Sequence, residues 1–263
     1  MKDIQSEEYK NHKVFEQITT LAKFYEDLSF GTMNWTSLGT TAIINLDTYV
    51  FSSMGGTLQS INEILKLGRI NDAFALLRKY FDSTIINVYT NLYLNDNFNY
   101  ENLIVEKVNK WLHGKDKLPE YRVLSQYIRS SQKLKPITDL LLIDDRYKTV
   151  RDRCNDHTHY NYFRNLMLNN SDVYLENRIK SLNIFSFDLE TIFIQHFSYI
   201  FYLNEHFMMS SDYMDYMEVS ETPPKDCEYW VAPYVQNIFD LIKTQRFDIA
   251  MCLKDKVKMH LVE

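Results

Sequence analysis

Residues 151–162 gather the side chains of this chain that could do chemistry. They include two arginines and two histidines close together, Arg151, Arg153, His157 and His159. A guanidinium holds a phosphate through a rigid fork of N–H donors, and an imidazole exchanges a proton near neutral pH. RNA carries its own nucleophile, the 2′-hydroxyl, so these two residue types suffice to cleave it. The segment therefore predicts a ribonuclease that needs no metal ion and no cofactor.

The expected reaction follows from the roles of these groups. One histidine accepts the proton of the 2′-hydroxyl as general base, and an arginine stabilises the charge on the phosphate as it becomes pentacovalent. A second proton donor, either a histidine or a group from another subunit, protonates the leaving 5′-oxygen. Asn155 or Asp156 would orient the imidazole. The products would carry a 2′,3′-cyclic phosphate.

Helical geometry alone leaves the working pair open. Each residue of an α-helix advances about 100° around the axis, so Arg153 and His157 share a face. Arg151 and His157 do not share one unless the helix breaks between them, and the same holds for Arg153 and His159. Two other interpretations remain. The cluster could be polar groups at a helix end, where His favours the macrodipole and Arg–Asp pairs are surface ion pairs. Asp156, His157 and His159 could also ligate a metal ion, although His-x-His places imidazoles on opposite sides of a helix.

The cluster resembles the Arg-x(4–6)-His motif of the HEPN superfamily, whose members are helical-bundle ribonucleases. Arg151-Asp152-x4-His157 matches this motif, and the polar residue directly after the Arg is common in that family. Arg153-x5-His159 matches it as well. On this resemblance we expect Arg151 and His157 to be the catalytic pair. The expected supporting residues are Arg153, Asn155, Asp156 and His159.

The resemblance also implies an assembly and a biological setting. It implies a helical core over about residues 41–209 and a homodimer in which two Arg/His motifs form one composite site. It implies a toxin or phage-defence ribonuclease acting on tRNA or mRNA, with an antitoxin or another defence protein as a further partner. The superfamily contains catalytically silent scaffolds and nucleotide binders too. The alternative is therefore a non-catalytic adaptor or sensor that holds a protein or nucleotide partner and tolerates the loss of His157 or His159.

A second group of candidate residues, the basic strip, lies within residues 107–135. This stretch holds eight basic and two acidic residues, although the whole chain carries a net charge of −6. A compact basic segment in an acidic protein can form a phosphate-facing strip, and a solvated helix–loop–helix surface is the alternative. Trp111 and Tyr121 accompany the strip and could stack on bases. The candidate RNA-binding residues are Lys107, Lys110, Lys115, Lys117, Arg122, Arg129, Lys133 and Lys135.

Arg78 and Asp82 form a third candidate group. They are four residues apart in a mostly apolar stretch that is predicted to be helical. A buried Arg needs a partner, and Asp82 can supply it. We expect either an intrahelical ion pair at the bundle surface or a polar support beside the Arg/His cluster.

The elements that must position these residues are predicted to be helices. The chain of 263 residues has only 6 Gly and 5 Pro, so few turns and long helices are favoured. Its 19 Tyr and 16 Phe indicate ring-rich helix interfaces. Asn71 or Asp72 is expected to cap the helix after Gly68, and the Arg/His cluster to lie where a helix ends or kinks. The apolar spacing predicts helices over residues 8–28, 40–66, 72–94, 101–112, 120–131, 136–153, 183–209, 230–243 and 247–261, with 160–168 continuing as a helix.

Together these elements predict an all-α, HEPN-like up-and-down bundle with additional N- and C-terminal helices. We expect one domain, residues 1–263, made of an N-terminal helix and loop (1–40), the core (41–209), an acidic linker (210–224) and a C-terminal helical pair (225–263). Cys154, Cys227 and Cys252 show neither a disulfide framework nor zinc spacing. The polar, acidic N-terminus is unlike a signal peptide, and no apolar run is long enough to span a membrane. These features predict a cytoplasmic protein with no membrane association.

Overall fold

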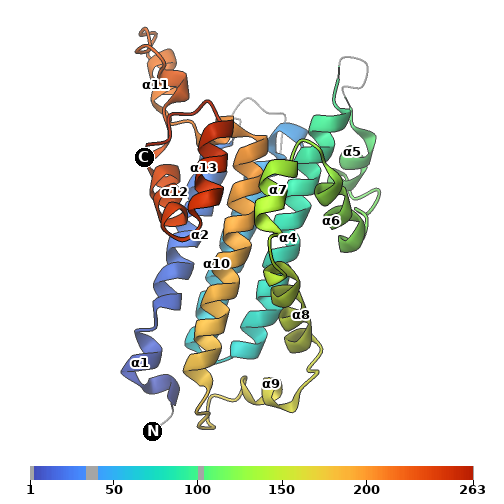
Figure 1. Ribbon diagram of the computed structural model, residues 1–263, viewed down its shortest axis with the longest axis vertical. Helices are drawn as coiled ribbons and strands as arrows, with labels where there is room; N and C mark the ends of the chain where they lie inside the picture. The colour runs from blue at the N-terminus through green and yellow to red at the C-terminus, as the bar shows by residue number, and fades with distance from the viewer. Residues whose placement is uncertain (1–2, 34–40, 100–103, 263) are drawn as a thin grey trace. The chain divides into compact units, whose positions relative to one another are not determined.

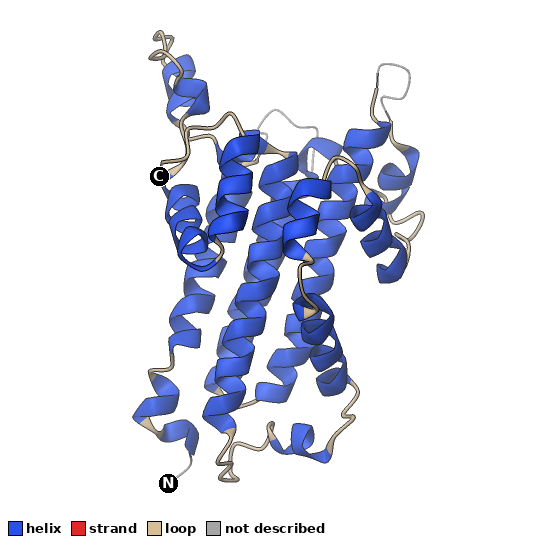
Figure 2. Ribbon diagram, viewed as in Figure 1, coloured by secondary structure: helices blue, strands red, loops and turns tan. Residues whose placement is uncertain are grey.

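The protein is all-α, as the sequence predicts (Figure 2). The computed structural model describes residues 3–33, 41–99 and 104–262. Within these ranges no β-strand forms, and an isolated antiparallel bridge joins Met209 to Val231. No helix in the same ranges is both long and apolar enough to cross a bilayer. Residues 34–40 of the predicted N-terminal loop and residues 101–103 of a predicted helix lie outside the described part.

The chain divides into two compact units. Unit 1 consists of Met1–Glu26, Val50–Thr84 and Asp144–Phe193, and unit 2 of Asp27–Tyr49, Ile85–Ile143 and Ile194–Glu263. Four long helices supply residues to both units: α2 (Lys13–Gly31), α3 (Leu46–Lys66), α4 (Ile70–Asn97) and α10 (Arg178–Leu203). Three of them, α2, α4 and α10, are labelled in Figure 1. The domain boundaries expected from the sequence stay a prediction.

Aromatic rings from four helices form the core of unit 1. Tyr25 of α2 lies against Phe51 of α3, Tyr80 of α4 and Phe193 of α10, at centroid distances of 6.3, 6.0 and 5.8 Å. The hydroxyls of Tyr25 and Tyr80 are 2.8 Å apart and share a hydrogen bond, so these two polar groups are buried with a partner. The ring-rich helix interfaces predicted from the composition are confirmed in this unit.

Helix α4 begins two residues earlier than the predicted helix 72–94. The helix begins at Ile70, so Asn71 and Asp72 lie in its first turn and do not precede it as caps. The exposed N–H groups of this turn are satisfied from another segment: Ile70 donates to the carbonyl of Leu168 (3.1 Å), and Asp72 donates to the side chain of Asn169 (3.1 Å). The side chain of Asn71 is therefore available for a different contact.

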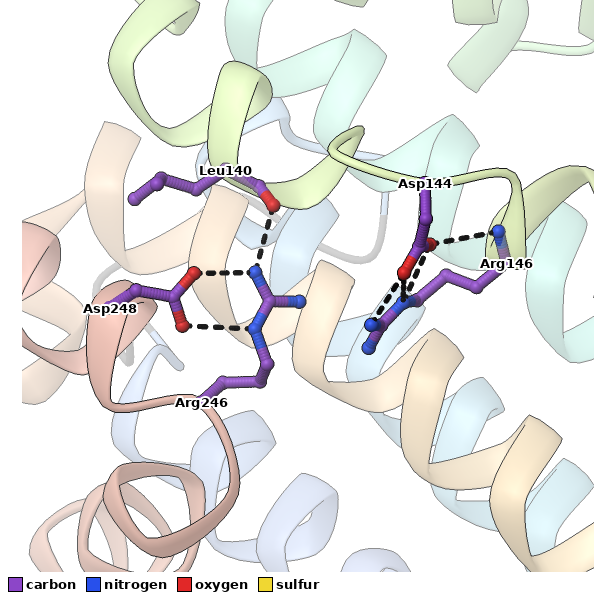
Figure 3. A network of polar contacts seen from close by, with 5 residues as sticks. All are labelled: Leu140, Asp144, Arg146, Arg246 and Asp248. Carbon is purple, nitrogen blue, oxygen red and sulfur yellow. Dashed lines mark hydrogen bonds and ion pairs between the residues drawn. The ribbon is translucent and has the colours of Figure 1, made fainter.

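Unit 1 is completed by α1 (Glu7–Lys10), α8 (Arg146–Thr158) and α9 (Phe163–Met167). The predicted helix 8–28 is two helices, because His12 interrupts it and its Nδ1 accepts from the N–H of Val14 (3.2 Å). The predicted helix 136–153 is also wrong, since residues 142–145 separate α7 (Lys135–Leu141) from α8. Asp144 accepts from both the backbone N–H and the side chain of Arg146 there (Figure 3). The Arg/His cluster consequently lies in the C-terminal part of α8 and reaches the end of that helix, as expected, with His159 as the C-terminal cap residue.

Unit 2 contains shorter helices besides the ends of the long ones. These are α5 (Glu106–Leu112), α6 (Tyr121–Ser130), α7, α11 (Asp212–Glu218), α12 (Pro233–Gln245) and α13 (Phe247–Lys256). α13 packs on α12 and α7. Arg246, between α12 and α13, donates to the carbonyl of Leu140 (2.8 Å) and to the carboxylate of Asp248 (2.7 Å) (Figure 3). α11 forms within the stretch predicted as a linker, and none of its side chains is buried.

Candidate active site

α8 distributes the predicted cluster over two faces. On one face, Arg153 and His157 line a cavity of about 820 Å³ that belongs entirely to unit 1. On another, Arg151 and Asn155 are bonded to residues of α4. The spacing explains this division, because residues four apart share a helical face and residues six apart do not. The pair Arg151/His157 expected from the sequence resemblance is thus not brought together within one chain.

The imidazole of His157 is buried and held on two sides. It stacks on Phe74 of α4 with ring centroids 4.0 Å apart and planes 10° apart. Its Nδ1 lies 2.8 Å from the side-chain oxygen of Asn71. Since an amide oxygen only accepts hydrogen bonds, Nδ1 carries the proton and Nε2 keeps its lone pair. The expectation that Asn155 or Asp156 orients the imidazole is wrong, because Asn71 does so.

Burial lowers the pKa of His157 from 6.5 to about 4, and the nearby carboxylate of Asp156 opposes this only in part. The ring is therefore neutral at pH 7 and can accept a proton. General-base catalysis is strongest when the pKa of the base lies near the working pH, so His157 is a weak base in the free protein. A phosphodiester anion in the cavity would favour the imidazolium and raise this pKa.

Arg153 lies between the cavity and a buried carboxylate. Its guanidinium donates to both oxygens of Asp188 on α10. Asp188 is buried, and burial raises the pKa of its carboxyl while Arg153 lowers it. Arg153 itself is partly exposed and forms part of the cavity wall. The guanidinium is thus fixed in position by Asp188 and still has donors for a second anion.

The other arginines belong to a network between α4 and α8. Asp82 accepts from Arg78 on its own helix (3.0 Å) and from Arg151 on α8 (2.9 Å). Arg78 also donates to the side chain of Asn155. None of these four residues lines the cavity. Arg78 and Asp82 form an ion pair within α4 and also bond to Arg151 and Asn155 of the Arg/His cluster. These contacts join α8 to α4 but do not reach the cavity.

The cavity wall carries as many basic as acidic side chains, and one of the basic ones, Arg153, is also paired with Asp188, which does not line the cavity. Three are basic and three are acidic, and His157 is neutral at pH 7. The basic ones are Arg153, Arg164 and Lys180, and the acidic ones are Asp152, Asp156 and Glu176. The cavity is therefore suited to a ligand that offers both an anion and hydrogen-bond donors.

The chain that contributes much of the cavity wall, residues 160–176, is anchored at both ends. Near its start, the carboxylate of Asp156 accepts from the side chain of Asn161 (2.7 Å), and the backbone carbonyl of Asp156 accepts from the side chain of Asn165 (3.0 Å). Near its end, the buried guanidinium of Arg178 donates to the carbonyls of Asn170 and Val173, each at 3.0 Å. The same guanidinium donates to the carbonyl of Gly68 after α3 (3.0 Å). Figure 1 traces this chain from α8 through α9 into α10.

The remaining predicted residues lie elsewhere. His159 is the exposed C-terminal cap residue of α8 and does not line the cavity. The basic strip belongs to unit 2. Several of its lysines already have partners: Lys110 with Glu106 (2.9 Å), Lys133 with Asp96 (2.7 Å) and Lys135 with Asp139 (2.8 Å), while the Lys107 ammonium lies 5.3 Å from the ring of Tyr93. Lys115, Lys117, Arg122 and Arg129 are exposed.

No metal site emerges in the described ranges. Nowhere in them do three or more His, Cys, Asp or Glu side chains gather as they would around an ion. Asp156, His157 and His159, the ligand set considered from the sequence, are among these residues. Comparisons of the chain with protein-family models, with curated proteins and with solved structures find no match.

Proposed function

We propose that this protein is a metal-independent, HEPN-like endoribonuclease whose cleavage site is the cavity beside α8. One observation supports the proposal above the others: an arginine and a neutral histidine, one helical turn apart, line the same cavity. Nε2 of His157 takes the proton of the 2′-hydroxyl, and the 2′-oxygen attacks phosphorus. The bond from phosphorus to the 5′-oxygen breaks, leaving a 2′,3′-cyclic phosphate, while Arg153 stabilises the added charge.

The proposal assigns the phosphate-binding role to Arg153 in place of Arg151. Arg151 is bonded to Asp82 and lies outside the cavity wall, whereas Arg153 is part of it. The proton for the 5′-oxygen comes from a second donor, and we place it on another copy of the chain. The homodimer, the tRNA or mRNA substrate and an antitoxin or defence partner rest on the sequence resemblance alone.

The test compares cleavage of total RNA by the purified protein in the presence of EDTA. The variants are His157→Asn, Arg153→Lys and, as a matched control on the same helix, Arg151→Lys. We expect fragments with cyclic-phosphate ends from the wild type and from Arg151→Lys, and little or no cleavage by the other two. Circular dichroism must show that all four proteins are folded alike.

Two results would overturn the proposal in different ways. Loss of cleavage in Arg151→Lys but not in Arg153→Lys would return the catalytic role to Arg151. Intact RNA with every folded protein, also after co-expression in phage-infected cells, would favour the non-catalytic adaptor or sensor.

A further inference from the structure

The anchored chain between α8 and α10 exposes four aromatic side chains within fifteen residues of sequence. Tyr160, Tyr162, Phe163 and Tyr174 are all exposed, and Phe163 is the most exposed of them at 75%. Single exposed apolar side chains are normal on a protein surface, so it is the position of Phe163 on the cavity wall that indicates a binding site. These four rings are called the aromatic segment below.

The aromatic segment adjoins the cavity. Phe163 and its neighbour Arg164 form part of the cavity wall, together with Arg153 and His157. The guanidinium of Arg164 lies 5.1 Å from the ring centroid of Tyr162, within the range of a cation–π contact. A planar ring and a planar cation are thus placed within one site with the candidate phosphate-binding residue. This combination of side chains is the one that binds nucleotides through their bases as well as their phosphates.

The charges of the cavity indicate that phosphate alone does not account for binding. Arg153, Arg164 and Lys180 are balanced by three carboxylates, Asp152, Asp156 and Glu176. Carboxylates repel a bare phosphate, but they accept hydrogen bonds from the amino groups of bases. Affinity must therefore come largely from the base, and an exposed ring is the side chain that supplies it.

We infer that the aromatic segment binds an unpaired base of single-stranded RNA, stacked on Phe163, next to the phosphate that Arg153 contacts. The inference deepens the proposed ribonuclease and rests on it for the position of the phosphate. Bases in a duplex are stacked on each other and offer no free face to a protein ring. The substrate class is consequently single-stranded RNA, with loops and unpaired ends included and uninterrupted duplexes excluded.

The experiment measures binding separately from cleavage. A short fluorescein-labelled RNA strand made of 2′-O-methyl nucleotides cannot be cleaved by 2′-hydroxyl attack, and its duplex with the complementary strand is the comparison. We expect the wild-type protein to bind the single strand more tightly by fluorescence anisotropy. Phe163→Ala should weaken binding about 5- to 150-fold, the range for loss of one base–aromatic stack, and Phe163→Trp should retain it.

Phe187 provides the matched control. It is an exposed phenylalanine of the same unit, at 54%, on α10, and it does not line the cavity. Phe187→Ala should leave the affinity for the single strand unchanged. Because few phosphates are neutralised in a balanced cavity, the affinity should also fall only slowly with salt concentration.

The outcomes separate this inference from the proposed function. Equal binding of single strand and duplex, or an equal effect of Phe163→Ala and Phe187→Ala, would overturn the inference even if the protein cleaves RNA. Binding through Phe163 without cleavage of natural RNA would support the inference and overturn the proposed ribonuclease function. If the wild type binds no single-stranded RNA, the inference is wrong, and the exposed rings would instead be a candidate surface for a protein partner.

Discussion

Replacing Arg153 by Met should destabilise unit 1, because the guanidinium neutralises a buried carboxylate. The side chain of Asp188 is 1% exposed, whereas that of Arg153 is 30% exposed. Removing one partner of a buried ion pair costs about 3–5 kcal/mol. Water can reach part of the space that Arg153 leaves, so we expect a loss of about 2–4 kcal/mol in the free energy of unfolding. For a chain of this size that corresponds to a fall of about 5–15 °C in melting temperature.

A second substitution identifies the buried charge as the cause. In the double variant Arg153→Met/Asp188→Asn, the carboxylate is replaced by an uncharged amide of nearly the same shape. We expect this protein to be more stable at pH 7 than Arg153→Met alone, since a neutral polar group is less costly to bury than an unpaired charge. Urea unfolding followed by circular dichroism measures both. If the double variant is less stable than the single one, the argument from the buried charge is wrong.

The pH dependence gives an independent check. Burial already raises the pKa of Asp188 above 3.8 in the folded protein, and loss of Arg153 removes a contribution that lowers it. A carboxyl with a raised folded pKa opposes folding above that pKa and ceases to do so once it is protonated. The penalty of Arg153→Met relative to the wild type should therefore shrink as the pH falls toward 3.8, the ordinary pKa of this carboxyl. A penalty that stays the same at every pH down to that value would refute the reasoning.

Three further perturbations probe the same unit. Asn71→Leu leaves the buried Nδ1–H of His157 without its acceptor, so unfolding in urea should show a loss of about 1–3 kcal/mol; no loss would mean that the hydrogen bond does not hold the ring. The imidazole of His157 should titrate near pH 4 by NMR. Because the unfolded chain binds this proton already near pH 6.5, the free energy of unfolding should be unaffected by His157 above pH 6.5 and should fall as the pH drops toward 4. The variant His157→Gln should lack this part of the destabilisation by acid. If its stability falls as steeply with falling pH as that of the wild type, the prediction is wrong. Gly68→Ala should lower the free energy of unfolding by about 1–3 kcal/mol, because φ is +78° and the new Cβ would lie 2.7 Å from Cγ2 of Ile4. Gly56→Ala should instead stabilise α3 by up to about 1 kcal/mol, because its new Cβ would have nothing within 4 Å. Thermal denaturation of this pair in parallel tests the contrast, and similar shifts would contradict it.

The long helices were predictable from the sequence, and some of their ends were not. The apolar residues of α10, such as Phe185, Leu189 and Phe193, recur at helical spacing and are buried, so the pattern reports the packed face directly. The break between α7 and α8 is not visible in this apolar pattern, because residues 142–143 are also apolar. The turn depends on the hydrogen bonds of Asp144 with Arg146, and the sequence pattern does not distinguish these from an ordinary surface ion pair.

The candidate site was predictable in its residue types and in part of its geometry. Helical spacing alone places Arg153 and His157 on one face, and the cavity lies on that face. The residues that position them, Asn71 on α4 and Asp188 on α10, are remote in sequence. An isolated Asn or Asp in an apolar helix gives no indication of its partner, since the pairing depends on how the helices pack. The partner of Arg151, Asp82, likewise lies on another helix, so helical spacing does not identify it as the partner.

The anchoring of residues 160–176 also governs how quickly a nucleic acid could be captured. Asp156 and Arg178 hold the backbone of this chain near its two ends, so the backbone does not have to be ordered when a ligand arrives. The cost in conformational entropy is met during folding, and association needs no closure step. The observed rate of binding should then rise in proportion to the RNA concentration, with an association rate constant of about 10⁵–10⁷ M⁻¹s⁻¹ or higher, and should not level off at the rate of a conformational change.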